Sequence, residues 1–277
     1  MVQIITDSSS LFTKDEGKKA GIEVLPLCVS IDDMEGRDLE INMDAFYDKI
    51  AKGGIPKSSQ PPIGEVMDTY EKYADAEIIN ISMADGLSGT YQTACGAKEM
   101  VDKNENITVI NTKTLCGPHH YMVKKAQQMK EAGKTAKEII SWLEKAKESH
   151  ESFLIPQDFN FLKRGGRLTP MAATFGSMLK LKPIMTQTED GCRLDKYAVK
   201  RNLKQAVDAV VSRWQKKGLD ARHIIYVSHA RAEEDAKKVI AQLKEHFAEV
   251  EIHMLELGAA FVTQGGPKCI AIQYIEK

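Results

Sequence analysis

Short apolar runs alternate with amphipathic stretches through the first half of the chain, and this alternation constrains the fold more than any other feature. The apolar runs read VQIIT, EVLPLCVSI, EIINISM and ITVIN, and stretches such as MDAFYDKIAKG and GEVMDTYEKYA separate them. Strand patterns that alternate with helical patterns are typical of α/β proteins, in which helices cover a largely parallel sheet. The sequence therefore predicts a three-layer α/β domain at the N-terminus.

A long helical pattern separates the first half of the chain from the second. It covers residues 118–150 with one break at Gly133, and the apolar SFLIP that follows predicts a fresh strand. The second half contains a helical run, MAATFGSMLKLKPIM, a hairpin at TEDGCRL and strand patterns at HIIYVSHA, EVEIHMLEL and KCIAIQYI. We therefore expect an N-terminal, largely parallel α/β domain over residues 1–151 and a mixed α/β domain over residues 152–277.

The charge balance and the apolar runs limit the classes of partner. The 38 basic residues against 39 acidic ones leave a net charge of -1, so no overall field draws the chain to nucleic acid or to an anionic membrane. No segment approaches the roughly 20 apolar residues that a membrane span needs, and MVQIITDSSS lacks the basic leader of a signal peptide. We expect a cytoplasmic protein without nucleic-acid partners and without integral membrane association.

Cysteines, histidines and glycine motifs indicate neither a cofactor nor a metal. Five cysteines are scattered without a C-x-x-C pair: Cys28, Cys95, Cys116, Cys192 and Cys269. We expect them to be reduced core residues. His119 and His120 occupy consecutive positions, so their side chains diverge, and no carboxylate lies at ligand spacing from them. Neither G-x-x-x-x-G-K-[ST] nor G-x-G-x-x-G occurs, so no site for ATP or NAD is predicted.

Clusters of small polar residues lie where strands of the first domain are predicted to end. We call TDSSS (residues 6–10) the first cluster, KSSQPP (57–62) the second cluster and GLSGT (86–90) the third cluster. Open parallel sheets bind ligands beyond the carboxyl ends of their strands, and hydroxyls with helix N-terminal amides suit an anion. The alternative is that Asp7, Ser8, Ser58 and Ser88 serve only as helix caps and turn residues. The occurrence of several such clusters favours an anion site.

Ser88 lies at a predicted strand-to-helix turn, where α/β hydrolases place a nucleophile. The nucleophile elbow requires G-x-S-x-G, whereas Gly89 follows this serine directly. A catalytic base would have to be a histidine such as His119, His120 or His229, and nothing in the sequence places one of them beside Ser88. A serine-dependent acyl hydrolase or transferase therefore stays only as an alternative to an anion-binding serine.

The segment LKRGGRL places Lys163, Arg164 and Arg167 around two glycines near the start of the second domain. An apolar run follows that would suit a flexible hydrocarbon chain. Its members are Met171, Phe175, Met178, Leu179 and Met185. The alternative is a solvated turn that leads into a core helix. An anion cradle that faces such a lining would fit an amphipathic acid.

The motifs IITDSSS, GIEVLPLCVSIDD, KSSQPP, DGLSGTYQTA, FLKRGGRL, GSMLKLKPIM and VTQGGPKCIAI occur in this order across nearly the whole chain. Together they resemble the DegV family, bacterial fatty-acid-binding proteins that serve as carrier subunits of a fatty acid kinase. The resemblance implies two α/β domains with a long-chain fatty acid, and no other cofactor, buried between or beneath them. It also implies a carrier that is not an enzyme; the alternative is a binding protein for another apolar acid or lipid. Its partner, an ATP-dependent fatty acid kinase, would convert the acid to an acyl phosphate for phospholipid synthesis.

The resemblance assigns roles to individual residues. The hydroxyls of Ser58 and Ser88 are expected to hold the carboxylate. The other expected ligand contacts are Ser59, Gly89, Thr90, Asp7, Ser8 and Gln264. Arg167 is expected at the head group or at the partner surface, with Lys163 and Arg164 steering the encounter with the kinase.

The chain departs from the family pattern at two of these positions. Ser58 stands where the family usually has threonine, a change that keeps the hydroxyl. Gln264 stands at the histidine position of the family's T-H-T-G-P-G loop. Glutamine cannot become an imidazolium, which alters the chemistry available for head-group recognition or for coupling to the kinase.

Overall fold

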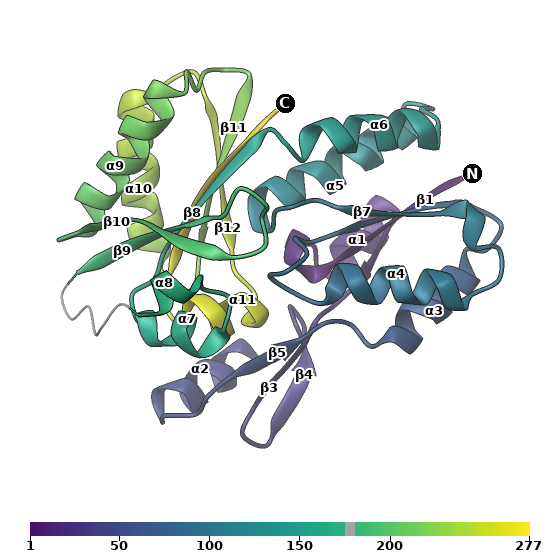
Figure 1. The fold of residues 1–277 in the computed structure, drawn as a ribbon, viewed down its shortest axis with the longest axis horizontal. Coiled ribbons are helices and arrows are strands. Elements are labelled where there is room, and N and C mark those ends of the chain that lie inside the picture. Colours follow the sequence, from purple (N-terminus) through teal and green to yellow (C-terminus); the bar gives the residue numbers. More distant parts are fainter. Residues whose placement is uncertain (175–180) are drawn as a thin grey trace. The chain divides into compact units, whose positions relative to one another are not determined.

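The chain forms two compact units in the computed structural model, which describes residues 1–174 and 181–277. Unit 1 comprises Met1–Glu148 together with Gly258–Ala260. Unit 2 comprises Ser149–Leu257 and Phe261–Lys277. Each unit contains its own sheet and its own hydrophobic core (Figure 1).

A four-stranded parallel sheet forms the centre of unit 1, with strand order β2-β1-β6-β7. The strands are β1 (Val2–Asp7), β2 (Ile22–Leu25), β6 (Glu77–Ser82) and β7 (Ile107–Asn111). Their isoleucines at positions 4, 5, 78, 79 and 81 are at most 1% exposed. Such burial on both faces is typical of a parallel sheet covered by helices, and it confirms the predicted parallel α/β arrangement.

Helices cover both faces of this sheet. On one face α3 (Ile63–Lys72) and α4 (Thr90–Met100) pack against the strands, and on the other lie α5 (Cys116–Glu131) and α6 (Ala136–Ala146) (Figure 1). The break at Gly133 is confirmed, since this glycine has a φ of +78° between α5 and α6. The remaining helical segments of unit 1 are α1 (Lys14–Ala20), α2 (Met43–Ala51) and the short 3-10 helices η1 (Ser8–Ser10) and η2 (Asn104–Asn106).

Unit 1 also contains a small antiparallel sheet with strand order β4-β3-β5. Its strands are β3 (Cys28–Ile31), β4 (Met34–Arg37) and β5 (Lys57–Ser59). The prediction of one continuous strand over EVLPLCVSI was wrong, because β2 and β3 belong to different sheets. Pro26 lies between them and has no N–H to donate to a ladder, so the chain leaves the first sheet there.

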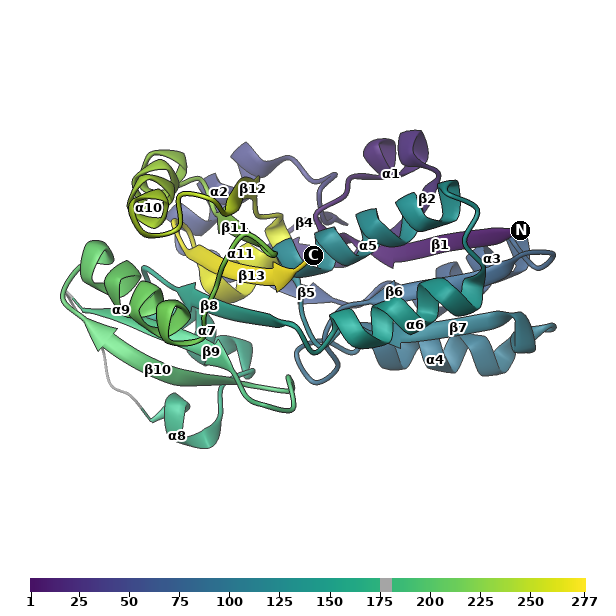
Figure 2. The same cartoon turned by 90° about the horizontal axis from the view of Figure 1, so that it is seen from above.

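Unit 2 is built on a six-stranded mixed sheet with strand order β10-β9-β8-β13-β11-β12. The strands are β8 (His150–Ile155), β9 (Lys182–Gln187), β10 (Leu194–Lys200), β11 (His223–His229), β12 (Glu251–Glu256) and β13 (Ile270–Glu276). β11 and β12 are parallel and the other pairs are antiparallel. β9 and β10 form the predicted hairpin (Figure 2). The expectation of a mixed α/β architecture in this half is therefore confirmed.

The core of unit 2 lies between this sheet and the helices α9 (Leu203–Lys216) and α10 (Glu233–His246). Trp214 is its largest fully buried side chain, and its Nε1 donates to Oε2 of Glu151 at 3.0 Å. Arg213 and Lys217 pair with the other oxygen of this carboxylate. Both oxygens of this buried carboxylate thus have partners.

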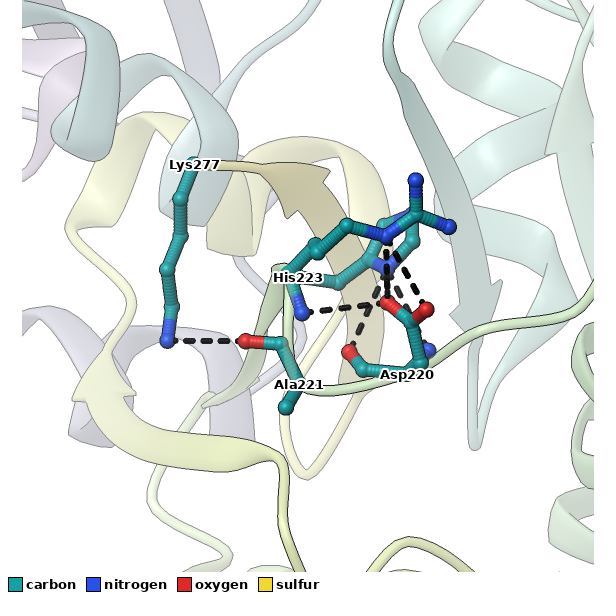
Figure 3. Close-up of polar contacts among 5 residues, drawn as sticks. Asp220, Ala221, His223 and Lys277 are labelled. Carbon is teal, nitrogen blue, oxygen red and sulfur yellow. Dashed lines mark hydrogen bonds and ion pairs between the residues drawn. The ribbon is translucent and has the colours of Figure 1, made fainter.

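Lys277, which directly follows β13, contacts the turn before β11 (Figure 3). Nζ of Lys277 donates to the carbonyl oxygen of Ala221 at 3.1 Å. Within the turn, Nε of Arg222 and Nδ1 of His223 contact the Asp220 carboxylate at 3.0 and 3.1 Å. Hydrogen bonds of the Asp220 carboxylate to these neighbours hold its pKa below the ordinary value.

Unit 2 also contains the short helices α7 (Phe159–Gly165) and α8 (Pro170–Ala173). A further short helix, α11 (Ala259–Gly265), begins in unit 1 with its first two residues and continues in unit 2. The prediction of one helix over MAATFGSMLKLKPIM was wrong, because residues 182–187 form β9, paired with β8 and β10. Pro183 in this stretch would remove a backbone hydrogen bond from a helix interior.

The proposed apolar lining along that run is not formed as expected. Met171 on α8 is 72% exposed, and Met185 on β9 is 1% exposed inside a cluster with Phe159 and Leu162. These two methionines therefore do not line a common surface. The other members, Phe175, Met178 and Leu179, lie outside the described residues.

Candidate functional site

Asp7 of the first cluster joins the carboxyl ends of two neighbouring parallel strands. Its Oδ1 accepts a hydrogen bond from the backbone N of Ser9, and its Oδ2 accepts one from the backbone N of Met83, both at 2.9 Å. The residue is 2% exposed. Its carboxylate therefore caps η1 and fixes the chain that leaves β6.

Ser8 is also buried and is held from two sides. Its Oγ donates to Oδ2 of Asp38 at 2.8 Å and accepts from the backbone N of Leu27 at 3.1 Å. Asp38 was not among the residues expected at the site, because its neighbours in EGRDLE are typical of an exposed segment. Burial raises the pKa of Asp38 to about 6.

His119 completes the hydrogen bonds of the first cluster. Its Nε2 lies 2.9 Å from the carbonyl oxygen of Ile81 and 3.0 Å from Oγ1 of Thr6, and its Nδ1 lies 2.8 Å from Oγ of Ser9. A carbonyl only accepts, so Nε2 carries the proton and Nδ1 accepts from the serine. Burial lowers the pKa of His119 below the ordinary value, which favours this neutral form.

The second cluster forms the edge strand β5, opposite β3. Ser58 pairs with Val29, which is 2% exposed, whereas Lys57 and Ser59 pair with Ser30 and Cys28. Side chains alternate between the faces of a strand, so Ser58 lies on the face of the buried valine and Ser59 on the opposite face. The two serines that the sequence grouped together are thus divided between the faces of the sheet.

A hollow of about 710 Å³ lies at this small sheet. It is lined by Cys28, Val29, Ser30, Glu35, Gly36, Arg37, Lys57, Ser58 and Ser59. Nη1 of Arg37 contacts Sγ of Cys28 at 2.6 Å, and the guanidinium pairs with Glu65 on α3. The charge of this arginine is therefore already balanced within the unit.

The third cluster forms the turn between β6 and α4. Oγ of Ser88 lies 2.8 Å from Oγ1 of Thr90 and accepts from the backbone N of Thr90 at 3.3 Å. Gly86 has a φ of +85°, a conformation that favours glycine. Ser88 is half-buried and Gly89 is exposed. Among the described residues no histidine is hydrogen-bonded to Ser88; His119 contacts Thr6 and Ser9 instead.

The second and third clusters meet inside unit 1. A Cβ placed on Gly89 would lie 3.2 Å from Cδ of Gln60, closer than ordinary van der Waals contact. The glycine therefore allows the Gln60 side chain to lie against the start of α4. Gln60 follows Ser59 in the KSSQPP motif, so its contact brings the strand of Ser58 to the turn of Ser88. Gln60 was not among the residues expected at the site, although the KSSQPP motif contains it.

The basic residues of LKRGGRL lie at the end of α7 in unit 2. Lys163 and Arg164 occupy its last turn, where cations interact favourably with the helix dipole. The guanidinium of Arg164 lies over the ring of Phe161, 4.6 Å from its centroid. Nη1 of Arg167 donates to the carbonyl oxygen of Gly165. Lys163 and Arg164 are exposed and Arg167 is half-buried.

Gln264 on α11 lies beside the same segment. A Cβ on Gly165 would come within 2.0 Å of Oε1 of Gln264, so the amide rests directly on the glycine backbone. Nε2 of Gln264 contacts Oγ1 of Thr263 at 3.2 Å. Oε1 is buried and has no hydrogen-bond partner among the described residues. The structure thus places Gln264 next to the loop of Arg167 within unit 2.

Residues 1–174 and 181–277 contain neither a candidate metal site nor a candidate membrane-spanning helix. No group of at least three His, Cys, Asp or Glu side chains in that part could hold a metal ion. No helix there is long and apolar enough to cross a membrane. No disulfide joins the cysteines of this part of the chain.

These features define a two-unit α/β protein whose hydroxyl-rich loops gather at the carboxyl edge of a parallel sheet. A family model described as "Uncharacterised protein, DegV family" matches residues 1–277. A DegV domain-containing protein of Clostridium perfringens is 31% identical over 99% of this chain and 98% of its own length. The chain belongs to the DegV family.

Solved structures of the family share the fold over the whole chain. DegV of Bacillus subtilis, described as a fatty acid binding protein, is 29% identical, with a TM-score of 0.85 over 100% of this chain and 99% of that one. A DegV family protein of Thermus thermophilus, studied for fatty acid binding, is 25% identical with a TM-score of 0.90 and the same coverage. The fold expected from the sequence is confirmed by these similarities.

Proposed function

We propose that this protein binds a long-chain fatty acid and holds its carboxylate with the hydroxyls of Ser58 and Ser88. The observation that carries the proposal is the packing of Gln60 against Gly89, which brings the two hydroxyl-bearing segments together at the carboxyl edge of the sheet. Fatty acid binding by the relatives from Bacillus subtilis and Thermus thermophilus supports the choice of ligand.

The hydrocarbon tail supplies most of the affinity in this proposal. Burial of about 14 methylenes at ~0.8 kcal/mol each offers on the order of 11 kcal/mol before ordering costs. A neutral hydroxyl hydrogen bond adds only about 1 kcal/mol. The serines therefore set the orientation of the acid more than its total affinity. Ser59, Thr90, Asp7 and Ser8 support the two serines by shaping the loops around the head group.

In this function the protein is a carrier and not the catalyst. A separate ATP-dependent fatty acid kinase would phosphorylate the bound acid to an acyl phosphate for phospholipid synthesis in the cytoplasm. Lys163 and Arg164 are exposed cations that can steer an acidic partner, and the planar guanidinium of Arg167 suits a phosphate or carboxylate oxygen. Gln264 beside Gly165 places an amide next to this basic segment.

Native mass spectrometry of the purified protein tests the ligand directly. We expect an adduct with the mass of a long-chain fatty acid, which organic extraction should release and identify. After incubation of the protein with a long-chain ester, mass spectrometry should find the ester intact, because a carrier does not catalyse hydrolysis. A lipid-free protein that also fails to take up added palmitate would refute the proposal, and ester cleavage abolished by Ser88→Ala would favour the hydrolase alternative.

A further inference from the structure

Gln60 follows the strand that bears Ser58, and its side chain lies against the turn that bears Ser88. A Cβ placed on Gly89 would lie 3.2 Å from Oε1 and 3.4 Å from Nε2 of this glutamine. Both ends of the amide therefore lie close to the residue that directly follows Ser88. The contact lies within unit 1, to which all four residues belong.

The backbone around Gln60 restricts where its amide can lie. Gln60 precedes Pro61, and a residue before a proline is biased towards an extended conformation. Successive side chains of an extended chain alternate in direction. The side chains of Ser58 and Gln60 therefore lie on one side of the segment, and that of Ser59 lies on the other. Ser58 and the amide of Gln60 can thus meet the same ligand.

The fold makes no use of the Gln60 amide for its own hydrogen bonding. The residue is exposed, and nothing in the part of the chain that the structure describes is hydrogen-bonded to its side chain. An amide group has two N–H donors and an acceptor oxygen. Its donors are therefore available to a ligand that Ser58 and Ser88 hold.

A carboxylate has more acceptor sites than two serines can fill. Its two oxygens offer about four lone-pair sites, whereas each hydroxyl has a single proton to donate. A hydrogen bond to a charged acceptor is also roughly twice as strong as one between neutral groups. An amide donor at the Gly89 turn therefore favours a carboxylate over an uncharged ester with the same hydrocarbon tail.

We propose that Gln60 is a third head-group residue, whose Nε2 donates a hydrogen bond to the carboxylate beside Ser58 and Ser88. The inference rests on the proposed function and adds to it a residue that makes the site select a free acid over its ester. Packing against Gly89 positions the amide, and the two serines orient the acid beside it.

Gln60→Met separates this role from packing alone, because methionine keeps the length of the side chain and lacks the amide. The dissociation constants of palmitate and methyl palmitate are measured at pH 8 by competition with a fluorescent fatty acid. We expect palmitate to bind about tenfold more weakly and methyl palmitate only about twofold, because the hydrogen bond to the charged group is the stronger. The preference for the acid should therefore fall about fivefold. Retained binding of methyl palmitate also shows that the variant is folded.

Gln60→Glu replaces the donor by a carboxylate of nearly the same shape. It should weaken palmitate binding more than Gln60→Met does, because the two carboxylates repel each other, and it should affect methyl palmitate little. Gln128→Met and Gln128→Glu are the matched controls, since Gln128 is an exposed glutamine on α5 of unit 1. Both controls should keep the parental preference for the acid.

A Gln60→Met protein with the parental preference would overturn the inference. Equal losses of palmitate and methyl palmitate would also overturn it, because they indicate packing alone. Ser88→Ala separates the inference from the proposed function. If Ser88→Ala lowers the preference for the acid and Gln60→Met does not, the serines hold the carboxylate without Gln60 and the inference alone fails. A parent protein that binds neither palmitate nor methyl palmitate refutes the proposed function, and the inference fails with it.

Discussion

The serine hydroxyls of unit 1 differ in burial and in the hydrogen bonds that they already make. Ser8, Ser9 and Ser10 are at most 1% exposed, and each is hydrogen-bonded to a group of unit 1. A buried hydroxyl that changes partner must leave another polar group unsatisfied, at a cost of about 1–3 kcal/mol. Ser58 and Ser88 are only half-buried. The head-group role therefore suits these two serines better than those of the first cluster.

Replacement of Ser88 by alanine should weaken fatty acid binding about tenfold, because one donor to a desolvated carboxylate is lost. The double change with Ser58→Ala should weaken it further. A displacement titration with a fluorescent fatty acid measures both. Ser212→Ala is the control, since this exposed serine on α9 donates a hydrogen bond to the carbonyl oxygen of Asp208, in unit 2. A double variant with parental affinity would show that the carboxylate lies elsewhere.

The cations of α7 lie in its last turn. Because Lys163 and Arg164 also stabilise the helix dipole, their loss should cost the fold only a few tenths of a kcal/mol to about 1 kcal/mol. The effect on an encounter with an acidic kinase surface should be larger, since exposed charges act mainly on association rates.

The Lys163→Ala/Arg164→Ala variant should therefore form acyl phosphate with the cognate kinase more slowly at low salt. Added salt should slow the parent more than the variant, because steering is what salt removes. Arg167→Ala should reduce turnover severely while lipid binding is largely kept. Lys237→Ala/Lys238→Ala, on α10, controls for loss of exposed charge. If the double variant and Arg167→Ala both support turnover at the parental rate at every salt concentration, these basic residues have no role in the encounter with the kinase.

The sequence predicted elements where local pattern decides them. The parallel strands, the break at Gly133 and the β9–β10 hairpin follow from periodicity and turn residues, and each is confirmed. The prediction was wrong at two prolines within apolar runs. At Pro26 the chain passes from one sheet to another, and Pro183 lies in a strand where a helix was predicted. No local pattern marks Asp38, because its Oδ1 accepts a hydrogen bond from the backbone N of Ala260, 222 positions away. The contact of Gln60 with Gly89 is hidden from the sequence for the same reason.

For the whole molecule, burial of Asp38 couples folding to pH. Burial raises the pKa of the folded Asp38 to about 6, from the ordinary 3.8 of an aspartate. The folded state thus binds the proton more tightly, so this contribution to stability is complete below pH 3.8 and is lost as the pH rises through 6. The difference corresponds to on the order of 3 kcal/mol.

Asp38→Asn should therefore be more stable than the parent at pH 7.5, and the advantage should vanish near pH 4. Urea unfolding at both pH values measures it, with Asp33→Asn as the control, because Asp33 is an exposed carboxylate of the same unit. An Asp38→Asn variant less stable than the parent at pH 7.5 would mean that the charged hydrogen bonds outweigh the cost of burial.

Each unit contains one of the two tryptophans, which allows each core to be followed separately. Trp142 lies on α6 of unit 1, 6.0 Å from the ring of Tyr121, and Trp214 lies in the core of unit 2. Trp214→Phe leaves fluorescence from unit 1 alone, and Trp142→Phe leaves it from unit 2. Ser58 and Ser88 belong to unit 1, so a ligand held there must stabilise that unit by mass action.

Delipidated Trp214→Phe protein should therefore show a higher unfolding midpoint when fatty acid is added. At a free concentration of 100 times Kd the gain is about 2.7 kcal/mol, which corresponds to several degrees for a unit of this size. Methyl palmitate, which keeps the tail but lacks the carboxylate, should stabilise unit 1 less. A shift confined to the Trp142→Phe protein would place the acid wholly in unit 2, away from Ser58 and Ser88.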